Sequence, residues 1–107
     1  MSSKENEYKE IFMAEALDNF EELNRLLTQL EKNPKDKKSI DAIFRITHTF
    51  KGNAAGMGFE DIASLSHTIE DFFGEIRNGN LEMSEDYFTD IFKSIDILGN
   101  LIQALKT

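Results

Sequence analysis

The chain has 107 residues, of which 40% are hydrophobic, and this length suits one compact domain with one core. It contains no cysteine, which excludes disulfides and thiolate metal sites and favours a reducing, cytoplasmic setting. Its formal net charge of -8 would repel phosphate backbones and anionic headgroups, so nucleic acid and membrane surfaces are poor candidate partners.

The first predicted helix covers about residues 5–31. Its apolar residues recur at steps of three and four, the spacing of an amphipathic helix. They are Met13, Ala16, Phe20, Leu23, Leu27 and Leu30. The following segment, 32–38, holds the only proline, Pro34, and four lysines. This segment is expected to be a surface loop because proline interrupts a helix and clustered lysines favour solvent.

A second helix is predicted over about 39–55 and a third over about 59–77. The second carries the apolar stripe Ile43, Ile46, Phe50 and Ala54, and the third carries Ile62, Leu65, Ile69, Phe72, Phe73 and Ile76. Glycines in 56–58 and in 78–80 suit the left-handed residue that commonly ends a helix. Because the link between the two helices is so short, they are expected to be antiparallel neighbours.

A fourth helix is predicted over about 84–106, with Ser84 as its N-cap. Its apolar positions are Phe88, Ile91, Ile95, Leu98, Ile102 and Leu105. No stop signal precedes Thr107, so the chain is expected to be a fragment of a longer protein. No segment alternates with the period of a strand. The sequence therefore predicts an all-α fold, an antiparallel up-and-down four-helix bundle forming a single domain over residues 1–107.

No segment has the pattern of a secretion signal or a membrane span. Residues 1–7 lack the apolar stretch of a signal peptide, and no run approaches the roughly 20 apolar residues that cross a bilayer. The chain is therefore expected to be soluble and cytoplasmic.

The chain has only two histidines, and each begins a pair of residues spaced by three on a predicted helix. At about 100° per residue, His48 lies about 140° from Ile43 and about 160° from Phe50, away from its helix's apolar stripe. His67 likewise lies about 160° from Ile69, and Glu70 lies about 60° from His67. Both histidines and Glu70 are therefore expected on accessible polar faces.

This arrangement is suited to accepting a phosphoryl group. A neutral imidazole is nucleophilic near pH 7 when an acceptor holds the proton on its other nitrogen. Glu70, on the adjacent antiparallel helix, is the expected acceptor, for either His48 or His67. Lys51, one turn after His48, places an ammonium where phosphoryl oxygens would lie. The sequence therefore predicts a phosphoacceptor site rather than a hydrolase.

Gly52, four residues after His48, has two interpretations. A glycine inside a helix costs up to about 1 kcal/mol relative to alanine, so its presence requires a reason. It either clears space for a partner's active site or permits close helix packing.

A zinc site formed by His48, His67 and Glu70 is the main rival chemistry. Because a His-Glu-x-x-His motif and a fourth protein ligand are both absent, no metal is predicted.

The residues around the histidines resemble a known family. Segment 48–52, with the sequence His-Thr-Phe-Lys-Gly, matches the His-x-x-Lys-Gly signature of histidine-containing phosphotransfer (HPt) domains. Gly-Phe at 58–59 and His-Thr-Ile-Glu at 67–70 resemble the version at the N-terminus of the CheA class of chemotaxis histidine kinases. The resemblance covers nearly the whole chain. Asn53 departs from the small Gly or Ser frequent after the motif, and the C-terminal fifth helix common in CheA domains is not expected within residues 1–107.

The resemblance implies a role for each of these residues. His48 would be the phosphorylated residue, with Glu70 as its hydrogen-bonding partner and Lys51 as the cation near the phosphoryl group. His67 would belong to the same polar network, and Gly52 would provide clearance for docking.

The resemblance also implies partners and a place in a pathway. The parent's separate ATP-binding kinase domain would phosphorylate His48, which would pass the group to an aspartate on a response regulator of the CheY or CheB type. This domain would need no cofactor and would not be an enzyme by itself. Alternatives are an HPt domain of a hybrid-kinase phosphorelay, a non-catalytic helical adaptor, or a bundle that binds metal through its histidines.

Overall fold

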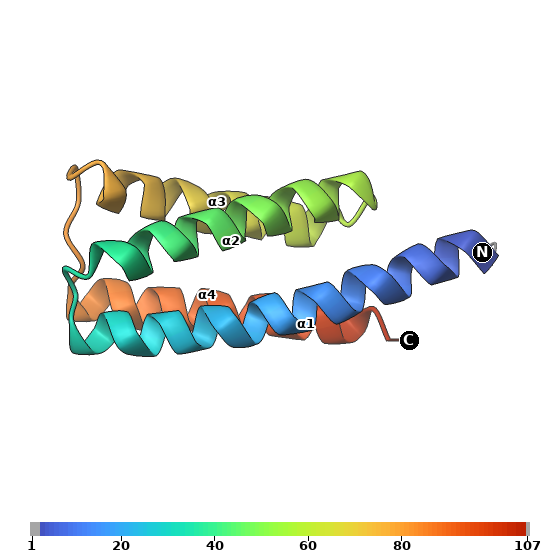
Figure 1. Ribbon diagram of the computed structural model, residues 1–107, viewed down its shortest axis with the longest axis horizontal. Helices are drawn as coiled ribbons and strands as arrows, with labels where there is room; N and C mark the ends of the chain where they lie inside the picture. Colours follow the sequence, from blue (N-terminus) through green and yellow to red (C-terminus); the bar gives the residue numbers. More distant parts are fainter. Residues whose placement is uncertain (1–2, 107) are drawn as a thin grey trace.

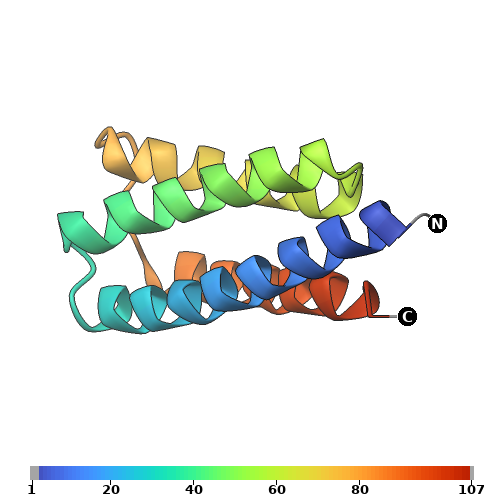
Figure 2. The same ribbon diagram turned by 45° about the vertical axis from the view of Figure 1, so that its right-hand side comes forward.

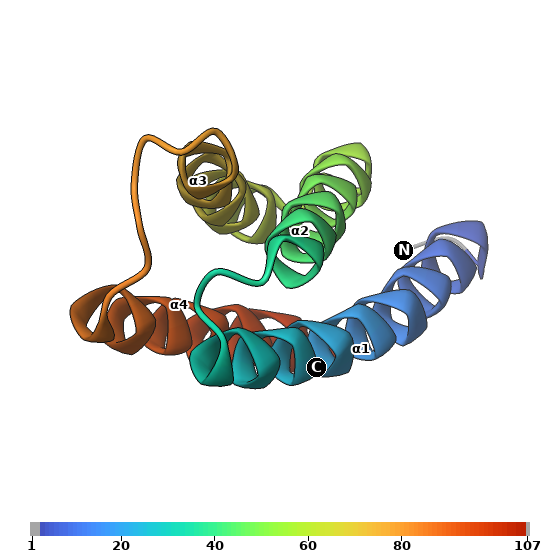
Figure 3. The same ribbon diagram turned by 60° about the vertical axis from the view of Figure 1, so that its left-hand side comes forward.

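The structure, a computed structural model, describes residues 3–106 and contains four helices. They are α1 (Ser3–Lys32), α2 (Lys37–Gly56), α3 (Glu60–Arg77) and α4 (Glu85–Ala104). Consecutive helices run in opposite directions, and α2 and α3 form one layer above the layer of α1 and α4 (Figures 1 and 3). The predicted all-α antiparallel bundle is confirmed. Met1, Ser2 and Thr107, which the predicted domain includes, lie outside the described residues.

Helix α2 begins at Lys37, two residues before the predicted start. The Asp36 side chain caps it, accepting hydrogen bonds from the Lys38 backbone N–H at 3.3 Å and the Ser39 hydroxyl at 2.7 Å. A carboxylate at this position satisfies a backbone donor that a helix start leaves unpaired. Lys37 and Lys38 therefore belong to the helix, and their assignment to the preceding loop was wrong.

Two glycines with left-handed backbone end α2 and α3. Gly58 has φ 78° and Gly79 has φ 81°. After α2, the Phe59 N–H donates to the Ala54 carbonyl at 2.9 Å, and the Gly58 N–H donates to the Ala55 carbonyl at 3.1 Å. This paired pattern is the Schellman motif, which requires a left-handed residue at the glycine position. The chain thereby reverses between α2 and α3 within a few residues and sets them side by side.

The core fills the space between the two layers. Its fully or nearly fully buried apolar residues are Phe12, Ala16, Leu23, Leu26, Leu27, Leu30, Ile40, Ile43, Phe50, Ala54, Ile62, Ile69, Phe73, Ile76, Phe88, Ile91, Ile95, Leu98 and Ile102. Most predicted stripe positions belong to this set. In α1, however, Phe12 rather than Met13 is buried, and its ring packs edge-on against Phe59 with the centroids 5.1 Å apart.

Helix α4 has the predicted N-cap but a shorter C-terminal end. The Ser84 hydroxyl accepts the Tyr87 N–H at 3.2 Å, as a capping serine does. The helix ends at Ala104 rather than 106. There the Leu105 N–H donates to the Ile102 carbonyl at 3.1 Å, a bond to the third residue back that tightens the last turn.

The start of α1 and the end of α4 lie at one end of the bundle, beside the α2–α3 turn (Figures 1 and 2). The N-terminal part of α1 runs past the other helices, and Tyr8 and Ile11 are each 56% exposed there. Across residues 3–106, none of the helices is both long enough and apolar enough to cross a membrane.

Candidate functional site

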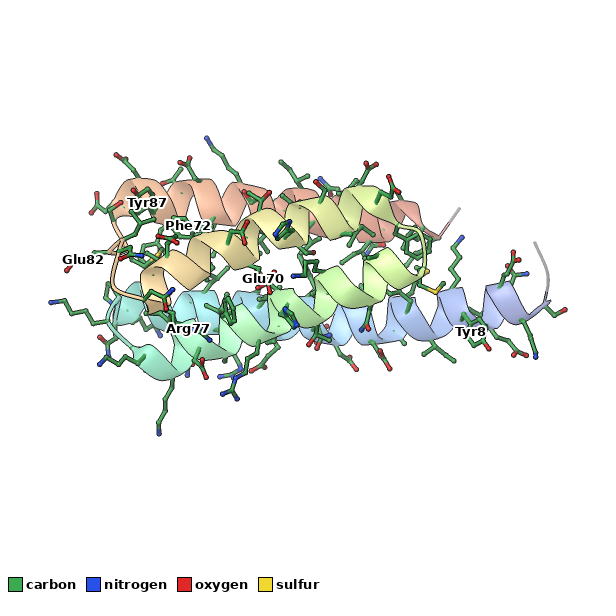
Figure 4. The ribbon with its side chains drawn as sticks, turned by 90° about the horizontal axis from the view of Figure 1, so that it is seen from above. Tyr8, Glu70, Phe72, Arg77, Glu82 and Tyr87 are labelled. Carbon is green, nitrogen blue, oxygen red and sulfur yellow. The ribbon has the colours of Figure 1, made fainter. Side chains whose placement is uncertain are left out.

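The site lies midway along the α2–α3 interface. His48 extends from α2 and Glu70 from α3, and His48 Nδ1 forms a hydrogen bond with Glu70 Oε2. The His48 side chain is 64% exposed, whereas the Glu70 side chain is only 7% exposed. Figure 4 shows the Glu70 carboxylate in the space between the two helices. An exposed imidazole therefore lies above a buried carboxylate supplied by the opposite helix.

The burial of Glu70 was not expected from the sequence, which placed this residue on an accessible face. On α3, Glu70 lies about 40° from Ser66 and about 60° from Phe73. Both of these residues are fully buried. Glu70 is thus at the edge of the buried face, and the close approach of α2 covers it. The expectation of an accessible Glu70 was wrong, because the face shared with His67 is only partly polar.

Lys51 contacts the same carboxylate. Its Nζ lies 2.6 Å from Glu70 Oε1, and its side chain is 32% exposed. Lys51 follows His48 by almost one turn of α2, so both side chains reach across the interface to one acceptor. The two Glu70 oxygens are therefore each engaged by a different donor from α2.

These contacts determine the charge state of Glu70. Burial acts to raise its pKa, but hydrogen bonds from Lys51 and His48, with the charges of both groups, outweigh burial. The pKa of Glu70 is consequently below its usual value, so the carboxyl group is ionised at neutral pH.

The ionised carboxylate defines the role of each His48 nitrogen. A carboxylate without a proton can only accept, so Nδ1 carries the hydrogen and donates it to Glu70. In the neutral ring, Nε2 then holds the free electron pair. Among residues 3–106, no hydrogen-bond partner engages Nε2. The arrangement thus leaves one ring nitrogen of His48 as an accessible nucleophile.

His67 lies beside this site but is paired differently. Its Nε2 is 3.3 Å from Asp71 Oδ2, and the two side chains are 57% and 68% exposed. The alternative hydrogen bond from His67 to Glu70 is not the one formed; His48 holds that position. Sequence reasoning missed Asp71, although its position one turn after His67 on the same helix would have indicated the pair.

His67, Glu70 and Asp71 also form a possible ligand group, with one ligand atom each and all three atoms within 4.8 Å of one another. An imidazole with two carboxylates is a donor set that Zn²⁺ can use. Both Glu70 oxygens already accept a hydrogen bond, from His48 and from Lys51, so a metal there would share this carboxylate with two cationic or hydrogen-bonding groups. The absence of a metal remains a prediction.

Gly52 lies on the exposed part of α2, one turn after His48. A Cβ added to Gly52 would meet no atom within 4 Å. Close helix packing therefore does not explain this glycine, and clearance beside His48 remains the interpretation that fits.

Comparisons with known proteins give a matching family model, similar sequences and a similar fold. The family model described as "Hpt domain" matches residues 7–107. Chemotaxis protein CheA from Halobacterium salinarum is 43% identical over 85% of this chain, and CheA from Bacillus subtilis is 36% identical over 94%. The structure of the CheA phosphotransferase domain from Thermotoga maritima aligns with a TM-score of 0.90 and 34% identity, covering 100% of both chains. The matched segments make up only 14% and 15% of the two CheA proteins.

Proposed function

This chain belongs to the Hpt domain family, and we propose that it is the phosphoacceptor and phosphocarrier domain of a CheA-type chemotaxis kinase, with His48 as the phosphorylated residue. The observation that carries the proposal is the exposed His48 ring whose Nδ1 is held by the buried, ionised Glu70. An ordinary surface histidine does not have a buried carboxylate as a hydrogen-bond partner. Here the partner fixes which nitrogen reacts.

The proposed reaction has two steps. First, the electron pair of His48 Nε2 attacks the γ-phosphorus of ATP held by a separate kinase domain. The N–P bond forms, the bond to the bridging oxygen breaks, and ADP leaves with that electron pair. Nδ1 keeps its proton, so positive charge grows on the ring, and the Glu70 carboxylate stabilises it.

In the second step, a carboxylate oxygen of an aspartate on a response regulator attacks the phosphorus. The N–P bond breaks and its electron pair returns to Nε2, which restores the neutral ring. Regulators of the CheY or CheB type are the proposed acceptors. The domain would thus be the substrate of one protein module and the phosphoryl donor of another, without catalysing either step by itself or holding a cofactor.

Lys51 and His67 have supporting roles in this proposal. The Lys51 ammonium is 2.6 Å from Glu70 and 32% exposed, so it can turn toward phosphoryl oxygens once the His48 ring is phosphorylated. His67, held by Asp71 at 3.3 Å, adds a second polar group beside Glu70. Gly52 leaves open space next to His48 for the incoming active site.

The relatives reported above are both named chemotaxis protein CheA, which favours this pathway over a hybrid-kinase phosphorelay or a helical adaptor. A cytoplasmic location accompanies the proposal, because an ATP-using kinase domain must have access to intracellular ATP.

The direct test incubates the domain with ATP and a CheA kinase core. We expect acid-labile phosphorylation of the wild-type domain and none of His48→Gln. The His67→Gln variant is the matched control, because it removes the other exposed imidazole. Labelling that persists in His48→Gln would overturn the assignment.

A further inference from the structure

Phe44 and Gly74 face each other one turn away from the His48–Glu70 contact. Phe44 precedes His48 by four residues on α2, and Gly74 follows Glu70 by four residues on α3. Because the helices are antiparallel, the two pairs form successive levels of one interface. A Cβ added to Gly74 would lie 3.4 Å from Phe44 Cε2 and 3.9 Å from Cδ2. A single Cβ at position 74 would thus make ordinary van der Waals contact with the edge of the Phe44 ring, and only a larger side chain would need the space that the ring occupies.

The Phe44 ring is also covered on one face. The Arg77 guanidinium carbon lies 4.0 Å from the ring centroid, a distance suited to a cation–π contact. Arg77 Nη1 is 3.5 Å from Asp41 Oδ1, and Arg45 Nη2 is 3.0 Å from Asp41 Oδ2. Figure 4 shows Arg77 reaching from the end of α3 toward α2. The ring therefore contacts Arg77 through one face and lies close to Gly74 at its edge.

A glycine inside a helix weakens that helix, so Gly74 requires a structural reason. The Phe44 ring limits how large a side chain at position 74 can be, whereas Gly52 has open space around it. On the other side of Glu70, one turn earlier, α3 has another small residue, the fully buried Ser66. The Ser66 hydroxyl has no hydrogen-bond partner within residues 3–106. The position therefore makes use of the small size of serine and not of its polar group.

From this arrangement we infer that Phe44 and Gly74 are positioning residues, which set the α2–α3 separation so that Glu70 reaches His48 Nδ1. The inference rests on the proposed function for its effect on phosphorylation. Its structural part is independent: a wider separation at the Phe44–Gly74 level lengthens the hydrogen bond at the next level and releases the His48 ring from one tautomer. Neither residue contacts the reacting nitrogen.

The test enlarges position 74 and then makes room for it. Gly74→Val places a branched side chain against the Phe44 edge, and Gly74→Val with Phe44→Leu relieves the crowding. Gly56→Ala is the matched control, because it adds a Cβ to another α2–α3 glycine with no atom within 4 Å. Two quantities are measured in each folded variant: the initial phosphorylation rate by a CheA kinase core, and the ¹⁵N chemical shifts of the His48 ring nitrogens.

We expect Gly74→Val to slow phosphorylation by about tenfold, within the effect that a misplacement near 1 Å can have. Its ring ¹⁵N shifts should move toward those of a mixed tautomer population. The double variant should recover both quantities, and Gly56→Ala should change neither. A normal rate and unchanged ring shifts in folded Gly74→Val would overturn the inference, as would failure of Phe44→Leu to restore them. If the wild-type domain is not phosphorylated at all, the proposed function fails, while the ring shifts still decide the positioning claim.

Discussion

Glu70 is buried at the α2–α3 interface and accepts the Nδ1 hydrogen of His48, which is itself exposed. This relationship joins a folding feature to a chemical one. The helix approach that buries the carboxylate also orients the imidazole, and Lys51 keeps the carboxylate ionised from the other side. Fold and reactivity should therefore respond together when the pair is altered.

Replacing Glu70 by Gln should slow phosphorylation of His48 by about 100-fold, in the range typical of a lost proton-transfer or orienting partner. The amide cannot stabilise the charge that grows on the ring. Unlike an exposed substitution, this change should also lower the free energy of unfolding by about 1–3 kcal/mol, because charged hydrogen bonds are lost. Rates with a kinase core and urea unfolding measure the two effects. Glu60→Gln, an exposed acid on the same helix, is the control; equal effects of both substitutions would remove Glu70 from the mechanism.

The lowered pKa of Glu70 predicts a pH dependence of stability. Its folded pKa lies below the unfolded value of about 4.3, so in the interval between them the unfolded state binds more protons. The stabilisation is therefore complete above the unfolded pKa and is lost as pH falls through the folded pKa. Wild type should exceed Glu70→Gln in unfolding free energy at pH 7, and that difference should shrink in acid. Denaturant unfolding across pH 7 to 3 checks this, and a difference that grows on acidification would contradict it.

Gly52→Ala should separate stability from function. A Cβ meets open space there, so the substitution should raise the free energy of unfolding by up to about 1 kcal/mol through helix propensity. If Gly52 gives access to His48, the same variant should be phosphorylated more slowly by a kinase core. Thermal unfolding and initial rates are the measurements. A stabilised variant with an unchanged rate would show that clearance is not its role.

Substitutions of His67 should have smaller effects than those of Glu70. His67 is exposed and bonded to the exposed Asp71, so His67→Ala should change the free energy of unfolding by no more than about 0.5 kcal/mol. Its effect on the phosphorylation rate should be less than that of Glu70→Gln, because the His48–Glu70 hydrogen bond remains. A reversed order of the two rates would place His67, rather than Glu70, at the centre of the site.

Local patterns in the sequence predicted most of the fold. Apolar spacing located four helices, and the glycines near 58 and 79 marked two helix ends, because both signals depend on nearby residues only. The start of α2 was missed because the Asp36 cap competes with a lysine-rich composition typical of loops. The predicted apolar stripe of α1 was also wrong at Met13. In the structure, the neighbouring Phe12 is the residue that is buried.

The sequence predicted which residues form the candidate site, but it did not predict how deeply the Glu70 side chain is buried. Helical spacing placed His48 outward and grouped His67 with Glu70, which the structure shows as well. Spacing along one helix cannot reveal how closely a second helix approaches. For that reason the spacing did not indicate the burial of Glu70 and left His48 and His67 open as its partner; the family resemblance implied His48, and the packed helices show that contact. The Phe44–Gly74 contact could not be predicted from the sequence for the same reason.

The central claim is that Glu70 holds Nδ1 and leaves Nε2 to react. Long-range ¹H–¹⁵N NMR of the phosphorylated domain identifies which nitrogen of His48 carries the phosphoryl group. The geometry predicts phosphorus on Nε2, with the Nδ1 hydrogen retained and facing Glu70. Phosphorus on Nδ1 would contradict the account, because the carboxylate would then have to give way to the group it is said to orient.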